Sequence, residues 1–111
     1  MALKRLGGVS PTLNTNTLLY QVPSGKNTSV STINVCNRSG LSIKFRIAHI
    51  AGDGISAVSN SDYVAFDVPL SAYNSLSITV GMAMGSNDSI MVRADSSEVT
   101  FIAWGNESTT I

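Results

Sequence analysis

Short runs of alternating apolar and polar residues, separated by turns, constrain the fold of this chain more than any other feature. The clearest run is Leu41–Ile47, in which every second residue is apolar. Because successive side chains of a strand point to opposite faces, this alternation predicts a β-strand with one buried and one solvated face. The stretch Leu19–Lys26 adds a turn signal, since Pro23 fixes φ at the turn entry and Gly25 accepts a positive φ. The chain is therefore expected to be built from hairpins.

Seven segments of this kind follow one another at a spacing typical of antiparallel sandwiches and barrels. We expect strands at Thr17–Val22, Thr28–Cys36, Leu41–Ile47, Asp62–Pro69, Leu76–Met82, Ser89–Ala94 and Glu98–Gly105. No stretch keeps apolar residues at the spacing of a helix, so essentially no helix is expected. The predicted fold is all-β: an antiparallel β-sandwich or a jelly-roll-like barrel of about seven strands.

The alternation also predicts which side chains enter the core. It assigns to the core face, among others, Leu18, Tyr20, Val22, Val64, Phe66 and Val68. The apolar positions change face between Val30 and Ile33, which indicates a β-bulge there. The last strand, Glu98–Gly105, is apolar on both faces, so we expect it to be central in its sheet or covered by a partner.

Two segments lack the alternation. Residues 1–16 show little periodicity and are interrupted at Gly7-Gly8 and Ser10-Pro11. Chain ends fray unless something holds them, so we expect an extended N-terminal arm that lies on a neighbouring subunit, followed by one sandwich domain over residues 17–111. Residues 51–61 form a loop longer than a usual hairpin connection. It is interpreted either as a crossover between sheets or as a binding loop.

Composition narrows the class of partner. Charged residues make up 13% of the 111 residues, about half of the roughly 25% usual in globular proteins. Abundant Ser, Thr and Asn leave a neutral surface suited to packing against other subunits. The net charge of zero argues against nucleic acid as the main partner, because phosphate binding needs a basic excess on one face. No targeting segment and no run of about 18 apolar residues is present, so we expect synthesis in the cytoplasm and no membrane partner.

Candidates for catalysis are few. His49 is the single histidine, and paired with Asp53 or Asp62 it would serve as a base or metal ligand. The favoured interpretation is a hydrogen-bonded histidine at the edge of the core. Cys36 and His49 would form a nucleophile pair, but Cys36 is better interpreted as a small buried hydrophobic residue. A lone cysteine forms no internal disulfide, and zinc needs several ligands that this chain does not cluster.

The carboxylates are scattered and Asp caps backbone amides in turns. They are Asp53, Asp62, Asp67, Asp88, Asp95, Glu98 and Glu107. A glycosidase needs two carboxylates about 5–10 Å apart across a cleft, and no pair is singled out. We therefore expect no enzyme activity, no catalytic residue, no cofactor and no metal site.

Lys44 and Arg46 project from the polar face of the strand at Leu41–Ile47. One interpretation is a patch that binds a carboxylate or a glycan. The favoured one is solvated charge on an edge strand, which blocks strand-to-strand aggregation.

Several further motifs stand out: Leu19–Lys26, Val35–Gly40, Phe45–Ala48, Asp62–Pro69 and Val99–Phe101 with Trp104-Gly105. Together these motifs resemble a family of small virion structural proteins of tailed bacteriophages. The opening Leu3–Gly7 is also similar to family members, and the resemblance extends from about Leu18 to Gly105. The resemblance implies a structural role and carries over no catalytic residue.

Three functions follow from this resemblance and from the residues. We expect a capsid decoration or cement protein that assembles as a symmetric homo-oligomer, a trimer, on the major capsid protein, because a subunit that binds only the assembled shell stabilises it. The second hypothesis is a tail, neck or baseplate accessory module that binds tail or neck proteins. The third is a carbohydrate-binding module, with the loop Gly52–Ser61 and nearby Tyr63 as its site.

Overall fold

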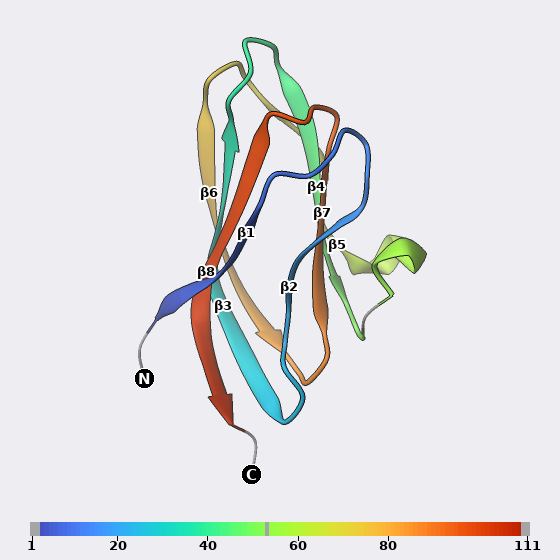
Figure 1. Cartoon of the computed structure of the whole chain (residues 1–111), viewed down its shortest axis with the longest axis vertical. Coiled ribbons are helices and arrows are strands. Elements are labelled where there is room, and N and C mark those ends of the chain that lie inside the picture. The colour runs from blue at the N-terminus through green and yellow to red at the C-terminus, as the bar shows by residue number, and fades with distance from the viewer. Residues whose placement is uncertain (1–2, 53, 110–111) are drawn as a thin grey trace.

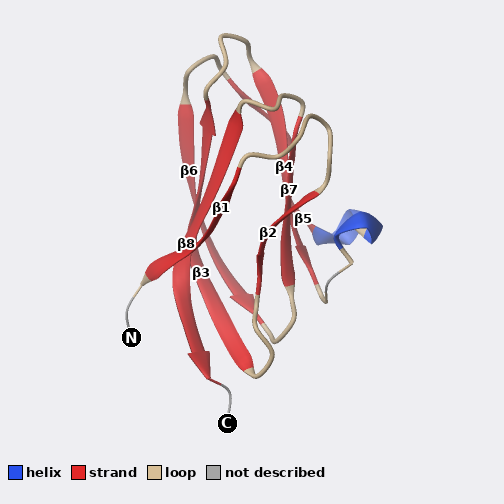
Figure 2. Cartoon of the chain, in the orientation of Figure 1, coloured by secondary structure: helices blue, strands red, loops and turns tan. Residues whose placement is uncertain are grey.

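Two four-stranded antiparallel sheets face each other and form a sandwich (Figures 1 and 2). The computed structural model describes residues 3–52 and 54–109. Sheet A contains, in spatial order, β1 (Lys4–Val9), β8 (Val99–Thr109), β3 (Lys26–Asn37) and β6 (Ser75–Met84). Sheet B contains β2 (Thr17–Gln21), β7 (Ser89–Ala94), β4 (Ile43–Ile50) and β5 (Tyr63–Leu70). This strand order is that of an eight-stranded, double-sheet jelly roll.

The predicted all-β sandwich is confirmed, with eight strands rather than seven. The helical segments among the described residues are two three-residue 3₁₀ turns, η1 (Ile55–Ala57) and η2 (Asn60–Asp62). Neither turn approaches the length of a membrane-spanning helix, and the rest of the described chain holds no such helix.

The eighth strand lies in the segment expected to form an arm. β1 pairs with β8 from Lys4↔Gly105 to Val9↔Phe101, so residues 4–9 belong to sheet A. Residues 10–16 then lead to β2, and the Asn14 amide donates to the Ala94 carbonyl at 2.8 Å. The alternation fails to mark β1 because its register shifts between Arg5 and Gly7, which breaks the period of two.

The core lies between the sheets and follows the predicted alternation along β4, β7 and β8. The rings of Phe45 and Phe101 meet edge to face at a centroid distance of 6.0 Å, and both are fully buried. Around them pack the fully buried side chains of Ile33, Ile47, Ile90, Val22, Val30, Val35, Val92 and Val99. Each such side chain contributes about 1.5–3 kcal/mol of hydrophobic free energy on burial. β8 is an inner strand of sheet A, as its two apolar faces indicate.

The predicted bulge in β3 is confirmed. The register of β3 shifts between Val30 and Thr32 against both neighbours, β8 and β6. Gly105 of β8 lies opposite Val30 at this point, and a Cβ on Gly105 would approach the Ser29 carbonyl oxygen to 2.2 Å. Only glycine permits the two backbones to come this close.

Bulges also explain why some core assignments are wrong. Leu18 is 41% exposed and Leu19 is buried instead, because the register of β2 shifts between Leu18 and Tyr20. Val64 and Phe66 are 47% and 54% exposed, because β5 shifts its register against β4. A shift of one residue turns the following side chains to the other face, and alternation alone does not reveal where it occurs.

A hydrogen-bonded cluster joins four strands near one end of the sandwich. The Tyr20 hydroxyl of β2 donates to Glu107 Oε2 of β8 and lies 2.8 Å from Thr28 Oγ1 of β3. Lys4 Nζ of β1 lies 2.8 Å from Glu107 Oε1. Burial, followed by the neighbouring Glu107, raises the pKa of Tyr20 to about 12. Hydrogen bonds from Lys4 and then from Tyr20 lower the pKa of Glu107.

We predict that Gly105→Ala destabilises the fold by about 1–3 kcal/mol, because its Cβ has no room beside the Ser29 carbonyl. Gly85→Ala is the control, since the nearest atom to a Cβ there is 3.9 Å away. Urea unfolding of both variants measures the difference. Equal midpoints for the two variants would contradict the close approach at Gly105.

The pH dependence of the stability of a Glu107→Gln variant tests the hydrogen-bonded cluster. Because the pKa of Glu107 is lowered in the folded state, its ionised form stabilises the fold above the ordinary pKa of 4.5. That stability is lost as pH falls through the folded pKa. We expect Glu107→Gln to cost about 1 kcal/mol at pH 7 and progressively less as the pH falls below the ordinary pKa of the carboxyl. Urea unfolding at a series of pH values measures this loss of stability. A loss that stays constant as the pH falls below 4.5 would exclude the Lys4–Glu107 ion pair as its source.

Candidate binding site on the outer face of sheet B

Three cationic side chains lie next to each other on the outer face of sheet B. Lys44 and Arg46 alternate with the buried Phe45 and therefore point outward from β4. Arg93 of β7 is the register partner of Arg46. β4 lies between β7 and β5, so the interpretation of Lys44 and Arg46 as charges on an edge strand is wrong.

A bulge in β5 brings two further side chains to Arg46. The register between β4 and β5 shifts so that Phe66 and Asp67 both lie opposite Arg46. Asp67 has a φ of 51°, in the left-handed region that Asp tolerates better than most residues. The extra residue therefore presents both an aromatic ring and a carboxylate to one guanidinium.

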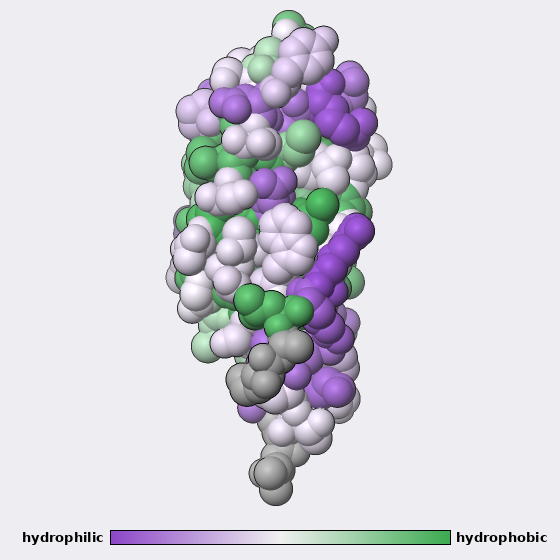
Figure 3. Space-filling view, turned by 90° about the vertical axis from the view of Figure 1, so that its left-hand side faces the viewer, coloured by the Kyte–Doolittle hydropathy of each residue, from purple (hydrophilic) through white to green (hydrophobic). Residues whose placement is uncertain are grey.

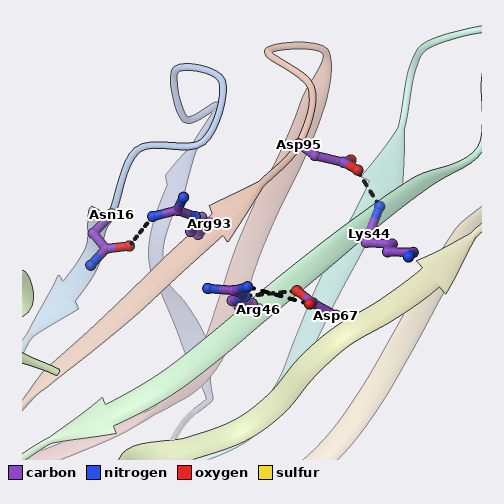
Figure 4. Close-up of polar contacts among 6 residues, drawn as sticks. All are labelled: Asn16, Lys44, Arg46, Asp67, Arg93 and Asp95. Carbon is purple, nitrogen blue, oxygen red and sulfur yellow. Dashed lines mark hydrogen bonds and ion pairs between the residues drawn. The ribbon is translucent and has the colours of Figure 1, made fainter. Parts of the chain in front are cut away.

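The contacts of Arg46 are specific. Its Nε donates to Asp67 Oδ1 at 2.7 Å and its Nη2 donates to Asp67 Oδ2 at 3.3 Å (Figure 4). Its Cζ lies 4.2 Å from the centroid of the Phe66 ring, within the range of a cation–π contact. The Tyr63 ring meets Phe66 edge to face at 4.8 Å. These contacts hold the Arg46 side chain in one orientation.

Arg46 and Asp67 each stabilise the ionised form of the other. The hydrogen bond from Arg46 lowers the pKa of Asp67, and the charges of Arg46, Lys44 and Arg93 lower it further. The same hydrogen bond raises the pKa of Arg46. Both groups therefore remain ionised across the neutral range. Because water screens an exposed pair, this contact orders the side chains more than it stabilises the fold.

A shallow depression lies among these groups. Asp95 Oδ1 accepts the Lys44 backbone N–H at 2.9 Å, and Arg93 Nη1 donates to Asn16 Oδ1 at 3.2 Å (Figure 4). The charged depression has a volume of about 170 Å³ and is lined by Asn14, Lys44, Arg46, Asp67, Arg93, Ala94 and Asp95.

The lining of the charged depression is suited to binding a small charged group. Three cations and two carboxylates leave an excess of one positive charge, which suits a small anion or a carboxylate. Neither a histidine nor a Ser, Thr or Cys nucleophile is among the residues that line it. The residues present supply hydrogen-bond donors and charge.

The long loop after β4 covers the neighbouring part of the same face. Ile55 and Val58 pack with Tyr63 against a second small cluster, formed by Ala48, Ile50 and Met91. β4 and β5 pair within sheet B, so the interpretation of residues 51–61 as a crossover between sheets is wrong. The loop returns the chain to the adjacent strand.

His49 has a different partner from the two considered in the sequence. Its Nε2 lies 3.0 Å from Asp88 Oδ2, and the residue is half-buried at the end of β4. Burial would raise the pKa of Asp88, but hydrogen bonds from His49 and from backbone amides outweigh it and lower that pKa. Asp62 accepts the Ser59 backbone N–H at 3.0 Å instead. Asp53 lies outside the described residues.

Cys36 does not join His49. It lies on the outer face of β3 in sheet A, whereas His49 belongs to β4 in sheet B. Cys36 is half-buried, so its assignment to the core is wrong. Among residues 3–52 and 54–109, no group of three or more His, Cys, Asp or Glu side chains is placed to hold a metal ion.

The sequence singled out Lys44 and Arg46 but missed Arg93 and Phe66. Arg93 occupies an outward position of an alternating strand, which the sequence does show. That β7 pairs with β4 is a long-range contact that no local pattern reveals. Phe66 was assigned to the core because the bulge beside it leaves no mark in the alternation.

Comparison of the chain with models of known protein families and with curated proteins finds no match.

The pKa of Asp67 tests the geometry of the site. We predict that Arg46→Gln raises the pKa of Asp67 from its lowered value toward the ordinary 3.8, because the variant loses the two charged hydrogen bonds. Carbon-13 NMR of the carboxyl group against pH measures it. Arg38→Gln, which removes a cation from the end of sheet A, is the control and leaves the titration unchanged. An unchanged Asp67 titration in Arg46→Gln would refute the pairing.

Proposed function

We propose that this protein is a structural subunit of a tailed-phage virion, and that it decorates the capsid as a symmetric homo-oligomer and stabilises the assembled particle. The resemblance of its motifs to small phage virion proteins supports this role. The observation that carries the proposal is the outer face of sheet A, which is broad and free of charge at its centre.

The sheet A face is formed by outward side chains of three neighbouring strands. They are Thr32, Asn34 and Cys36 of β3, Thr100, Ile102 and Trp104 of β8, and Ser75, Ser77 and Thr79 of β6. Figure 3 views the molecule from this side and shows mostly pale and green residues, with hydrophilic ones gathered at the right and the upper part. Arg5, beside Trp104, and Arg38, beside Thr100, lie at its margins.

This composition is that of an interface core. Residues buried at the centre of protein–protein interfaces are depleted in charge and enriched in aromatic side chains. Trp104, half-buried on the inner strand β8 within the sheet A face, is of the type that most often dominates binding energy. We infer that this face packs against another virion protein, with the major capsid protein as the first candidate.

The fold adds support by analogy. Double-sheet jelly rolls occur in viral capsid proteins and in lectins, so the fold alone does not decide between an assembly role and a sugar-binding role. A subunit that binds only the assembled shell shifts the equilibrium toward it, and many copies add their contributions. A tail, neck or baseplate accessory module would use the same face against a different partner.

Phe66 favours carbohydrate binding as the second candidate function. Its ring is 54% exposed beside Arg46 and Tyr63, and exposed aromatic rings provide stacking platforms for sugars. For this function we propose Phe66 and the charged depression as the site, in place of the loop Gly52–Ser61 with Tyr63 that the sequence indicates. Binding on a glycan array that Phe66→Ala abolishes would favour this function.

Immunogold labelling of purified virions tests the proposed function. We predict that antibodies against this protein label the heads of intact particles, with particles from a phage lacking the gene as the control. Label confined to the neck or tail would favour the accessory module. Absence of label, together with absence of the protein from purified virions, would overturn the virion role.

A further inference from the structure

β6 is a long edge strand of sheet A that carries neither charge nor proline, two of the features that usually protect such an edge. It pairs with β3 on one side, and no described strand pairs with it on the other. Its residues Ser75–Met84 include no charge and no proline. An exposed edge presents a row of unpaired backbone groups, and charges, prolines, bulges or short length normally keep other strands away.

The other edges of the sandwich carry such protection. β1 has six residues, a register shift and the charges of Lys4 and Arg5. β5 has Pro69 and the bulge at Asp67. β2 has five residues and a register shift. β6 also has a register shift, beside Gly81, but the six residues before it, Ser75–Val80, are regular and uncharged, so this part of the edge remains suited to pairing.

The sandwich is also open along β6. β1 and β2 approach each other at one side of the sandwich, whereas β5 and β6 share few close backbone contacts at the other. Inward side chains of β6 are consequently incompletely covered: Leu76 is 37% exposed, and Ile78 and Val80 are half-buried. Apolar surface left at an unpaired strand edge is what a pairing strand would bury.

We propose that β6 pairs with β6 of a second copy of this chain, antiparallel and about a two-fold axis at Ile78. This pairing joins the two sheets A into one sheet of eight strands. Gly81 has a φ of 55°, and the register against β3 shifts beside it, so the regular part of the edge is Ser75–Val80. The inference names the interface of the proposed homo-oligomer and rests on that part of the proposed function, not on the location in a virion.

The composition of β6 favours a second copy as the occupant. In an isologous contact a strand meets its own residues, so any charge near the axis would face a like charge, and β6 has none. The register at Ile78 sets Leu76 opposite Val80 of the second copy and the two Ile78 side chains together. It keeps the hydroxyls of Ser77 and Thr79 on the outer face. The pairing stops at two copies, because the free edges of the joined eight-stranded sheet are the two β1 strands, which carry Lys4 and Arg5.

Solution mass tests the pairing. Size-exclusion chromatography with light scattering should give twice the chain mass of 11.6 kDa for the wild type, a dimer rather than the trimer expected from the sequence. The double variants Ser77→Lys/Thr79→Lys and Ser77→Glu/Thr79→Glu place like charges opposite each other and should be monomers. An equimolar mixture of the two variants should restore the dimer mass, because each strand then faces the opposite charge.

Leu18→Lys is the control, since it adds a positive charge at an exposed position of β2, the edge strand on the opposite side of the sandwich, and should leave the dimer intact. Thermal unfolding of every variant checks that a change from dimer to monomer mass does not result from unfolding of the chain. A wild type that is a monomer, as expected if a strand of another protein is the occupant, or a trimer would overturn the proposal, as would dimeric double variants. If the protein is a monomer in solution but labels virions, only the β6 pairing is overturned. If it is a dimer in solution but is absent from virions, only the proposed location is overturned.

Discussion

The long antiparallel pairing of β3 with β8 is the interaction on which the rest of the structure depends. It runs from Lys26↔Thr109 to Asn37↔Val99, and the two remaining strands of sheet A attach to its two sides. The inward side chains of these strands fill the centre of the core. The bulge at Val30 would separate the strands if Gly105 carried a side chain, so one glycine allows the pairing to continue past it. The sheet A face takes its central residues from these two strands.

The sandwich departs from simple alternation of buried and exposed side chains at its β-bulges. The same bulges shape the charged depression and the edge of β6. The bulge in β5 sets Phe66 and Asp67 against Arg46 and so forms one wall of the charged depression. The bulge beside Gly81 limits the regular edge of β6. Each is a local change of register, costs a ladder hydrogen bond and turns a side chain to a new face. The outer faces of the two sheets thus differ in chemistry: that of sheet B carries the Arg46–Asp67 ion pair, and the sheet A face is uncharged at its centre.

The alternation of residues predicts the strands that have one clean buried face. Phe45 and Ile47 in β4 and Phe101 in β8 lie in the core as expected. The position of the β3 bulge is predictable because core-facing apolar residues both precede and follow it. β1 is not predicted from the sequence because its glycines and its register shift interrupt the alternation of apolar and polar residues. The partners of Arg46 and His49 come from other strands, and long-range pairing of this kind has no local signature.

We propose that the functional surfaces belong to sheet A, with a face uncharged at its centre for a virion partner and the uncharged edge of β6 for a second copy. Cryo-electron microscopy of the intact phage particle tests this claim most directly. It should show the sandwich with Trp104 and its neighbours on the sheet A face covered by another virion protein. A particle in which this face points into solvent while sheet B makes the contact would contradict the account.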